Sequence, residues 1–294
     1  MRKKDNKMQN GEVRMQNKHT CWQKFLSSFC ILHFAFYISL VGCNTTQPTA
    51  APAPPPHPPA SLVAANQALA ANMPDAAIAD AQSYLRSQPN GPQAAEAWYF
   101  QGRGYEMKVA ADPSGVQSNL TEARTCYLEA LQLSPERSLE GDIRASYSKD
   151  AFYQDDFADT IQQATAALPL VSSRETKANL LLFIGRSQQR LSRFTDADQT
   201  FRQVEQRYPG SQFAAAAKQF EGLRDFYVQL NTYSSKDLAD RAIASLRASG
   251  VIISERTDSK GNTVIDIGPF TTYADAKKAK NPLQKNFPLA EIVP

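Results

Sequence analysis

The chain has 294 residues, enough for two modest domains, and its 42% hydrophobic and 21% charged residues are ordinary for a soluble globular protein. All three histidines lie before residue 58, so residues 60–294 cannot form a Ser-His-Asp or Cys-His catalytic site or a His-ligated zinc site. Only Cys126 lies beyond residue 43, which excludes a disulfide or a cysteine zinc site there. These exclusions favour a binding protein over an enzyme, and we expect neither a metal nor a cofactor.

Residues 1–42 have the pattern of a secretory signal. Residues 1–24 contain seven Lys or Arg against two Asp or Glu, and a mostly apolar run of 17 residues follows from Phe25 to Val41. A basic region, an apolar region and a small residue before a cleavage site are typical of such signals. The alternative is an uncleaved membrane anchor, for which 17 residues are at the lower limit of length. Removal of this segment changes the formal charge from +3 to −2, so the basicity belongs to the signal.

The end of this segment reads Leu40-Val41-Gly42-Cys43. It resembles the lipobox of bacterial lipoproteins, which implies that Cys43 carries the lipid and becomes the first residue. Several acyl chains hold a protein on a membrane far more firmly than one does. Asn44 follows the cysteine, and by the sorting rule of enteric bacteria this favours the outer membrane. We therefore expect a cell-envelope protein with a lipid anchor, facing the periplasm.

Residues 43–60 predict a tether, because seven prolines lie between residues 44 and 60. Proline removes amide donors and fixes φ, which excludes a helix or a central strand. A polyproline spacer rises about 3.1 Å per residue, so this segment would reach roughly 50 Å. A recognition motif for a proline-binding groove is the alternative.

Residues 61–222 predict an all-α repeat array, because helical patterns recur and strand patterns are scarce. One set of spaced residues is Gly185, Ala197, Phe201 and Pro209. A second set, interrupted by a predicted loop insertion at 110–118, comprises Trp98, Gly102, Tyr105, Ala123, Tyr127, Ala130 and Pro135. These spacings resemble tetratricopeptide (TPR) repeats, which implies stacked helix pairs that bind a protein partner along a concave face. A generic helical bundle is the alternative, and Cys126 is expected to be a buried structural thiol.

The pattern changes at residue 224, and residues 224–294 predict a small α+β domain. Phe226 to Leu230 alternates apolar and polar side chains, as a half-buried strand does. Gly268-Pro269-Phe270 is expected to end the third strand. The expected β-α-β-β-α-β order places two helices on one face of a four-stranded sheet. The predicted strands are 226–230, 251–256, 263–267 and 289–293, and the predicted helices run from Ser234 or Ser235 to Arg247 and over about 273–286.

Four pieces of sequence in this region carry a resemblance. They are Tyr227-Val228-Gln229-Leu230, Ser234-Ser235, the segment from Leu246 to Gly250, and Ile267-Gly268-Pro269-Phe270. In this order they resemble the SPOR domain, which binds peptidoglycan glycan strands stripped of their stem peptides. An unrelated ferredoxin-like domain is the alternative.

Period-two alternation assigns the faces of the predicted sheet. It directs Phe226, Val228 and Leu230 towards the helices, and Tyr227, Gln229 and Asn231 to the open face with Val264 and Asp266. An aromatic ring can cover apolar sugar faces while amides pair with hydroxyls and acetamides. Asn231 replaces a glycine that is usual in the family, and Val264 and Asp266 replace arginines, so Asp266 is expected to repel glycan carboxylates. A merely solvated sheet face is the alternative. The candidate glycan-binding residues, led by Gln229, are Gln229, Tyr227, Asn231, Tyr233, Ser234 and Asp266.

Modules that bind RNA share this topology, but a secretory signal and the near balance of ten Lys or Arg against eight Asp or Glu in residues 224–294 argue against nucleic acid. We therefore predict a non-catalytic envelope lipoprotein that binds peptidoglycan and recruits a protein partner, in cell division or wall remodelling. One competing hypothesis is an adaptor in outer-membrane or envelope assembly, in which the last domain only positions the array. Another is a carboxylate-using wall hydrolase, although no paired Asp/Glu pattern stands out.

Overall fold

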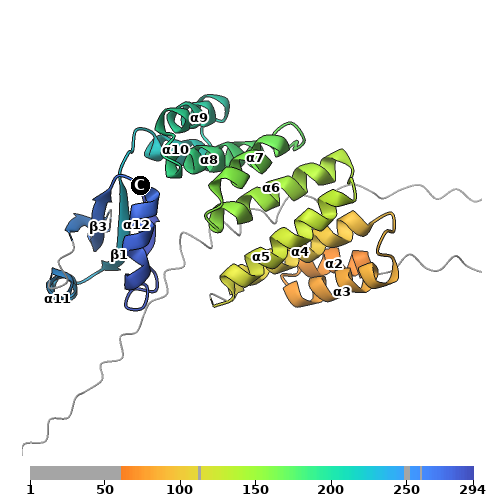
Figure 1. The fold of residues 1–294 in the computed structure, drawn as a ribbon, viewed down its shortest axis with the longest axis horizontal. Coiled ribbons are helices and arrows are strands. Elements are labelled where there is room, and N and C mark those ends of the chain that lie inside the picture. Colours follow the sequence, from red (N-terminus) through yellow and green to blue (C-terminus); the bar gives the residue numbers. More distant parts are fainter. Residues whose placement is uncertain (1–60, 112–113, 248–251, 259) are drawn as a thin grey trace, which may run out of the picture.

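The computed structural model describes residues 61–111, 114–247, 252–258 and 260–294. They form a helical array followed by a smaller domain that contains a sheet (Figure 1). The predicted signal segment, Cys43, the tether and Gly250 lie outside the described residues. No helix in the described ranges combines the length and apolar character that crossing a membrane requires.

The array consists of four consecutive helix pairs and one closing helix, as predicted for residues 61–222. Partners within each pair pack against each other, and α10 packs against α8 and α9. The second helix of the second pair begins only after α4 has run to Ala111, so most of the predicted insertion at 110–118 is helical. The helices are α2 (Ser61–Ala70), α3 (Pro74–Ser87), α4 (Ala94–Ala111), α5 (Val116–Gln132), α6 (Arg137–Tyr153), α7 (Phe157–Ala167), α8 (Arg174–Arg190), α9 (Phe194–Arg207) and α10 (Gln212–Phe220).

The turn within a pair has the same geometry in three of the pairs. Asn72, Asp155 and Ser192 each adopt a positive φ, of 57°, 62° and 61°, just after the first helix of the pair. In each turn the next residue donates its amide to a carbonyl five positions back, as Asp156 N does to Ala151 O at 2.9 Å. This arrangement is the Schellman helix ending, and Asn, Asp and Ser stand where glycine is usual. The turn therefore repeats in structure even where the sequence repeat is weak.

Small residues allow the two helices of a pair to approach closely. A Cβ atom added to Gly185 would lie 2.6 Å from the ring of Phe201, and one added to Gly102 would lie 2.5 Å from the ring of Tyr127. Phe201 and Tyr127 are fully buried. These are the residues whose spacing predicted the repeats, so the predicted packing is confirmed.

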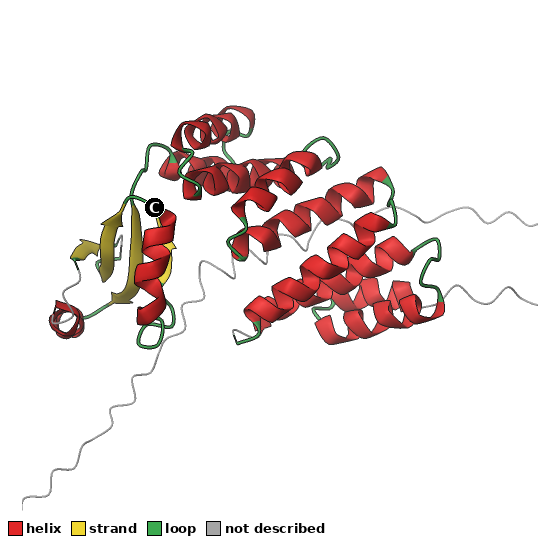
Figure 2. Ribbon diagram, viewed as in Figure 1, coloured by secondary structure: helices red, strands yellow, loops and turns green. Residues whose placement is uncertain are grey.

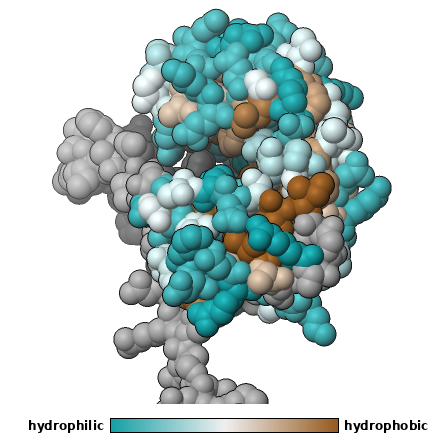
Figure 3. Space-filling model, turned by 90° about the vertical axis from the view of Figure 1, so that its left-hand side faces the viewer, coloured by the Kyte–Doolittle hydropathy of each residue, from teal (hydrophilic) through white to brown (hydrophobic). Residues whose placement is uncertain are grey.

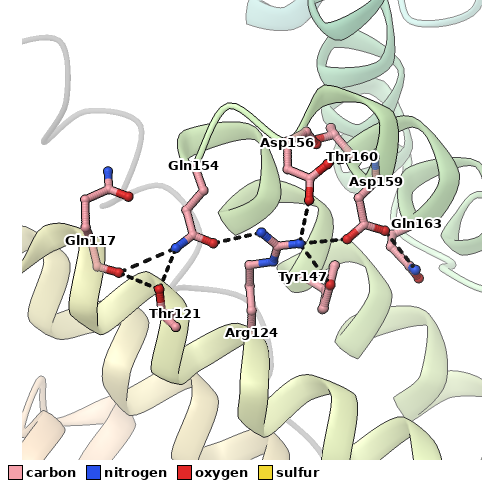
Figure 4. A network of polar contacts seen from close by, with 9 residues as sticks. All are labelled: Gln117, Thr121, Arg124, Tyr147, Gln154, Asp156, Asp159, Thr160 and Gln163. Carbon is pink, nitrogen blue, oxygen red and sulfur yellow. Dashed lines mark hydrogen bonds and ion pairs between the residues drawn. The ribbon is translucent and has the colours of Figure 1, made fainter. Parts of the chain in front are cut away.

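Arg124 of α5 joins the second pair to the third (Figure 4). Its guanidinium donates to Asp159 of α7 at 2.7 Å, to Asp156 at 2.9 Å and to Tyr147 of α6 at 3.0 Å. It also donates to Gln154, whose own amide donates to Thr121 of α5. The side chain of Arg124 is only 18% exposed, so the chain of polar contacts holds neighbouring repeats together in a protected environment.

The first helices of the pairs form the inner layer of the array. The pairs α2–α4, α4–α6 and α6–α8 pack against each other. Among the described residues the backbones of the second helices of successive pairs do not approach each other in this way, although the long side chain of Arg124 bridges α5 and α7. Because helices on the concave side of a curved stack approach more closely than those on the convex side, α2, α4, α6 and α8 line the concave face.

The carboxy-terminal domain is a four-stranded antiparallel sheet with two helices on one face (Figure 2), as predicted. The strand order is β2-β3-β1-β4. The prediction that β3 ends before Gly268-Pro269 is wrong: the strand continues through a cis Gly268–Pro269 bond to Phe270, which pairs with Phe226. The elements are β1 (Phe226–Tyr233), α11 (Lys236–Arg247), β2 (Ile253–Thr257), β3 (Thr263–Phe270), α12 (Tyr273–Lys280), the 3-10 helix η1 (Asn281–Leu283) and β4 (Glu291–Val293).

Candidate functional site

The open face of the sheet carries a row of polar side chains. Val228 of β1 pairs with Ile267 of β3, and both belong to the core beneath the helices. The next residues along the strands, Gln229 and Asp266, pair with each other and therefore project from the opposite face. Glu291 of β4 pairs with Gln229 from the other side. The predicted positions of Gln229 and Asp266 on the face away from the helices follow from this register.

Arg256 of β2 connects these residues, and sequence reasoning missed it. Its Nε donates to Asp266 Oδ2 at 2.7 Å, and a terminal nitrogen donates to Gln229 Oε1 at 2.5 Å. Guanidinium groups only donate hydrogen bonds, so this contact fixes the amide oxygen of Gln229 towards Arg256. The Gln229 nitrogen donates to no atom within the described ranges. Period-two reading of residues 253–257 would have placed Arg256 on this face.

Asp266 lies where it was predicted but has a different environment. Its side chain is 6% exposed, whereas that of Arg256 is 50% exposed. The expectation that Asp266 presents a repelling charge to a glycan is wrong, because Arg256 covers and neutralises this carboxylate. The cation on the face thus comes from β2. The second oxygen of Asp266, Oδ1, is buried without a hydrogen-bond partner among the residues that the structure describes.

A register irregularity after Gln229 changes the predicted positions of Asn231 and Tyr233. Asn231 pairs with Ile265, a core residue, and Tyr233 packs against the core cluster. Because directly paired residues share a face, the prediction from strict alternation that Asn231 points to the open face is wrong. Thr232, which pairs with Val264, takes that position instead. The Oδ1 atom of Asn231 accepts a hydrogen bond from Thr232 N at 2.8 Å, which stabilises the bulge.

Tyr227 and Ser234 lie at opposite ends of the face. Tyr227 is half-buried and pairs with Val293 of β4. Its ring lies beside Gly268, where an added Cβ atom would come within 3.1 Å of Tyr227 Cδ1, so the glycine gives the ring its room. Ser234 is exposed in the turn after β1, and the Ser235 carbonyl accepts the first helical bond of α11 from Ala239. Ser234 is therefore accessible at the rim of the face.

The chemistry of this face suits a hydroxyl-rich polymer. Gln229 and Arg256 supply donors, Tyr227 supplies an aromatic ring and Thr232 supplies a hydroxyl. Figure 3, which views the molecule from the side of the carboxy-terminal domain, shows a mainly hydrophilic surface with smaller hydrophobic areas. The described residues contain no group of three His, Cys, Asp or Glu side chains placed to hold a metal ion.

A buried charge cluster lies in the array between α4 and α6. Glu106 pairs with Arg103 at 2.8 Å and with Lys149, and Asp150 lies beside it. Burial, followed by the neighbouring charge of Glu106, raises the pKa of Asp150 well above its ordinary value. Both carboxylic side chains are enclosed, with Glu106 6% and Asp150 1% exposed. The enclosed carboxyl groups of Glu106 and Asp150 lie between α4 and α6, where a polymeric substrate could not reach them.

Comparisons with known proteins give one family match and one structural similarity. A search of curated proteins found no match. This chain is similar to a solved structure described as "YrrB: a TPR protein with an unusual peptide-binding site", with 18% identity over 54% of this chain and 75% of that one and a TM-score of 0.43. Residues 222–294 match the family model of the SPOR domain. The carboxy-terminal part thus matches the SPOR domain, which implies association with peptidoglycan in the cell envelope.

Proposed function

We propose that this protein is a non-catalytic envelope lipoprotein whose SPOR domain binds denuded peptidoglycan glycan strands through the open face of its sheet. The observation that carries the proposal is the Arg256–Gln229–Asp266 arrangement, which holds one amide of β1 in a fixed orientation. A preorganised donor binds a ligand more tightly than a free one, because less side-chain freedom is lost on binding.

Each contact on the face has a chemical counterpart in the polymer. The Gln229 nitrogen donates to an acetamide carbonyl or a hydroxyl oxygen of the sugar chain. The Tyr227 ring covers the apolar C–H groups of one sugar ring. Arg256, half exposed, attracts the lactyl carboxylates that remain once stem peptides are removed, while its bond to Asp266 keeps it in place.

The rest of the chain supplies location and recruitment in this proposal. Cys43 carries the lipid that anchors the protein to the membrane, the outer membrane facing the periplasm being the proposed one. Residues 43–60 tether the folded part, and the concave face of the array takes a segment of a protein partner involved in cell division or wall remodelling. The second candidate is an adaptor in envelope assembly, favoured by the size of the array relative to the SPOR domain.

The test is co-sedimentation of the full chain with peptidoglycan sacculi treated with an amidase that removes stem peptides. Gln229→Ala and Arg256→Ala are each expected to lower the bound fraction about tenfold, as loss of a hydrogen bond that involves a charged group would. Arg241→Ala is the matched control, because Arg241 is exposed on α11, on the other side of the sheet. If Gln229→Ala and Arg256→Ala leave sedimentation unchanged, the site assignment is wrong. If the unsubstituted chain does not sediment with the glycan, the proposed function is wrong.

The adaptor hypothesis is distinguished in cells by the same substitutions. If wall binding is essential, Gln229→Ala combined with Arg256→Ala reproduces the phenotype of a null strain. If the array is primary, the doubly substituted protein restores the normal phenotype. Point substitutions are preferable to deletion of 224–294, because deletion would uncover Phe152 and Phe183 of the array, which now share a core cluster with the SPOR domain.

A further inference from the structure

The SPOR domain is packed against the array. Phe152, Phe157 and Phe183 of the array belong to one buried cluster with Phe226 and Tyr273 of the SPOR domain. The ring of Tyr273 meets that of Phe157 edge-on, with centroids 5.1 Å apart. Apolar side chains of both parts are thus removed from water by a common contact.

A polar hub lies at the edge of this cluster. Asp155, in the turn between α6 and α7, accepts a hydrogen bond from the Tyr273 hydroxyl at 2.6 Å and an ion pair from Lys277 at 2.8 Å, both from α12. Arg190 of α8 lies 3.7 Å from the same carboxylate, and its guanidinium lies 4.7 Å from the centre of the Tyr273 ring. Burial and the carboxylate of Asp155 raise the pKa of Tyr273, so its hydroxyl stays a donor. One carboxylate therefore joins the two parts.

The array surface in this contact combines α6 and α8 with the α6–α7 turn and Phe157 at the start of α7. Phe152 lies on α6, and Phe183 and Arg190 lie on α8, two of the helices that form the inner layer. The SPOR domain meets this surface through α12, which packs on the side of the sheet opposite Gln229. Figure 1 shows α12 between the sheet and the array. The glycan-binding face and the docked face are therefore back to back.

We propose that this contact is autoinhibitory: the SPOR domain is the resident occupant of this seat on α6, the α6–α7 turn and α8, and a partner segment binds there only when the domain undocks. The seat fits a helical segment with an aromatic residue at position i and a basic residue at i+4, because Tyr273 and Lys277 of α12 occupy it in this way. The inference rests on the proposed role of the array as a protein-binding module, and glycan binding does not enter it.

The connection between the two parts makes such a switch reversible. α10 ends at Phe220 and β1 begins at Phe226, so five residues link them. Five extended residues span at most about 17 Å, which keeps an undocked domain close to its seat. The linked SPOR domain therefore competes with a free partner segment for the seat at an effective concentration in the millimolar range. A free ligand therefore binds weakly until docking is weakened.

The experiment measures binding of a fluorescent peptide with the sequence of residues 272–284, which contains Tyr273 and Lys277, to the purified full chain. Lys277→Glu changes a residue of the SPOR domain and leaves the sequence of the array unchanged. It places a second carboxylate beside Asp155 and is expected to favour the undocked state about tenfold. The peptide should then bind this variant about tenfold more tightly than the unsubstituted chain. Lys278→Glu is the matched control, because Lys278 is 80% exposed and pairs only weakly with Asp275 of its own helix.

Hydroxyl-radical footprinting of the same samples checks that undocking and not unfolding is measured. Lys277→Glu should raise labelling of Phe183 and Tyr273 severalfold, while Phe201 in the core of the array and Leu230 under the sheet of the SPOR domain stay protected. A peptide in which Tyr273 is replaced by alanine should lose the binding. Equal peptide affinity for the unsubstituted chain and Lys277→Glu would overturn the proposal, and so would the absence of binding to either. Sedimentation with glycan is unaffected by these outcomes, so this inference and the proposed wall binding fail separately.

Discussion

Arg124 of α5 and Asp159 of α7 lie 35 positions apart in sequence and are joined by a 2.7 Å ion pair. The pair crosses from one repeat to the next, and Asp156 and Tyr147 contact the same guanidinium nitrogen. Replacement of Arg124 would leave two carboxylates and a hydroxyl without their donor.

Arg124→Met is therefore expected to lower the free energy of unfolding by about 2 kcal/mol, the order of a lost hydrogen bond to a charged group. Chemical denaturation followed by circular dichroism measures the change. Arg202→Met is the control, because Arg202 pairs with Glu221 in a half-exposed position and should change stability by less than about 1 kcal/mol. Equal losses in the two variants would contradict the role of Arg124.

Gly185→Ala is expected to destabilise the array by about 1–3 kcal/mol, because its Cβ atom would collide with the ring of Phe201. This cost exceeds the gain of up to about 1 kcal/mol that alanine brings to a helix. Combining Gly185→Ala with Phe201→Leu should cost less than the sum of the two single changes, since the smaller side chain makes room. Strict additivity in the thermal midpoints would show that the close approach does not matter.

Arg186 is a cation without a carboxylate partner among the residues described. It lies over the rings of Phe152 and Phe220, at 5.2 and 4.6 Å from their centres. Burial, followed by repulsion from Arg190, lowers the pKa of Arg186 to about 10. Arg186→Met keeps the volume and removes an unfavourable charge, so the midpoint of thermal unfolding should stay unchanged or rise. A fall of several degrees, measured by calorimetry, would mean that the ring contacts outweigh the repulsion.

Cys126 gives stability a dependence on alkaline pH. Burial, followed by the charge of Glu122, raises the pKa of the thiol to about 12. A group whose pKa is raised by folding stabilises the folded state below its unfolded pKa, near 9, and this contribution is lost as pH rises towards 12. The free energy of unfolding should therefore fall above pH 9, and Cys126→Ala should fall less steeply. Alkylation at pH 8 followed by mass spectrometry should leave Cys126 unmodified in the native chain.

The sequence predicted the repeats where packing demands a particular residue. The ring of Phe201 fills the space that Gly185 leaves by having no side chain. Such a pair requires specific residue types at a fixed separation, so it can be recognised in the sequence. Alternation in residues 253–257 would have placed Arg256 on the open face, but its contact with Gln229, 27 positions away, has no local signal. Asn231 was placed on the wrong face because a one-residue irregularity reverses alternation without a distinct residue signature. The contact between Asp155 and Tyr273, which lie 118 positions apart, depends on how the array and the SPOR domain pack together. The sequence of neither part alone indicates it.

The short link between α10 and β1 limits how far the SPOR domain can move relative to the array. A domain fixed to a glycan can move by at most about 17 Å relative to the array before the link is taut. The predicted tether at the other end would allow roughly 50 Å. In a chain held at both the proposed lipid anchor and the proposed glycan contact, a change in the distance between the two would be taken up first by the tether, and only a taut tether would load the contact between Asp155 and Tyr273.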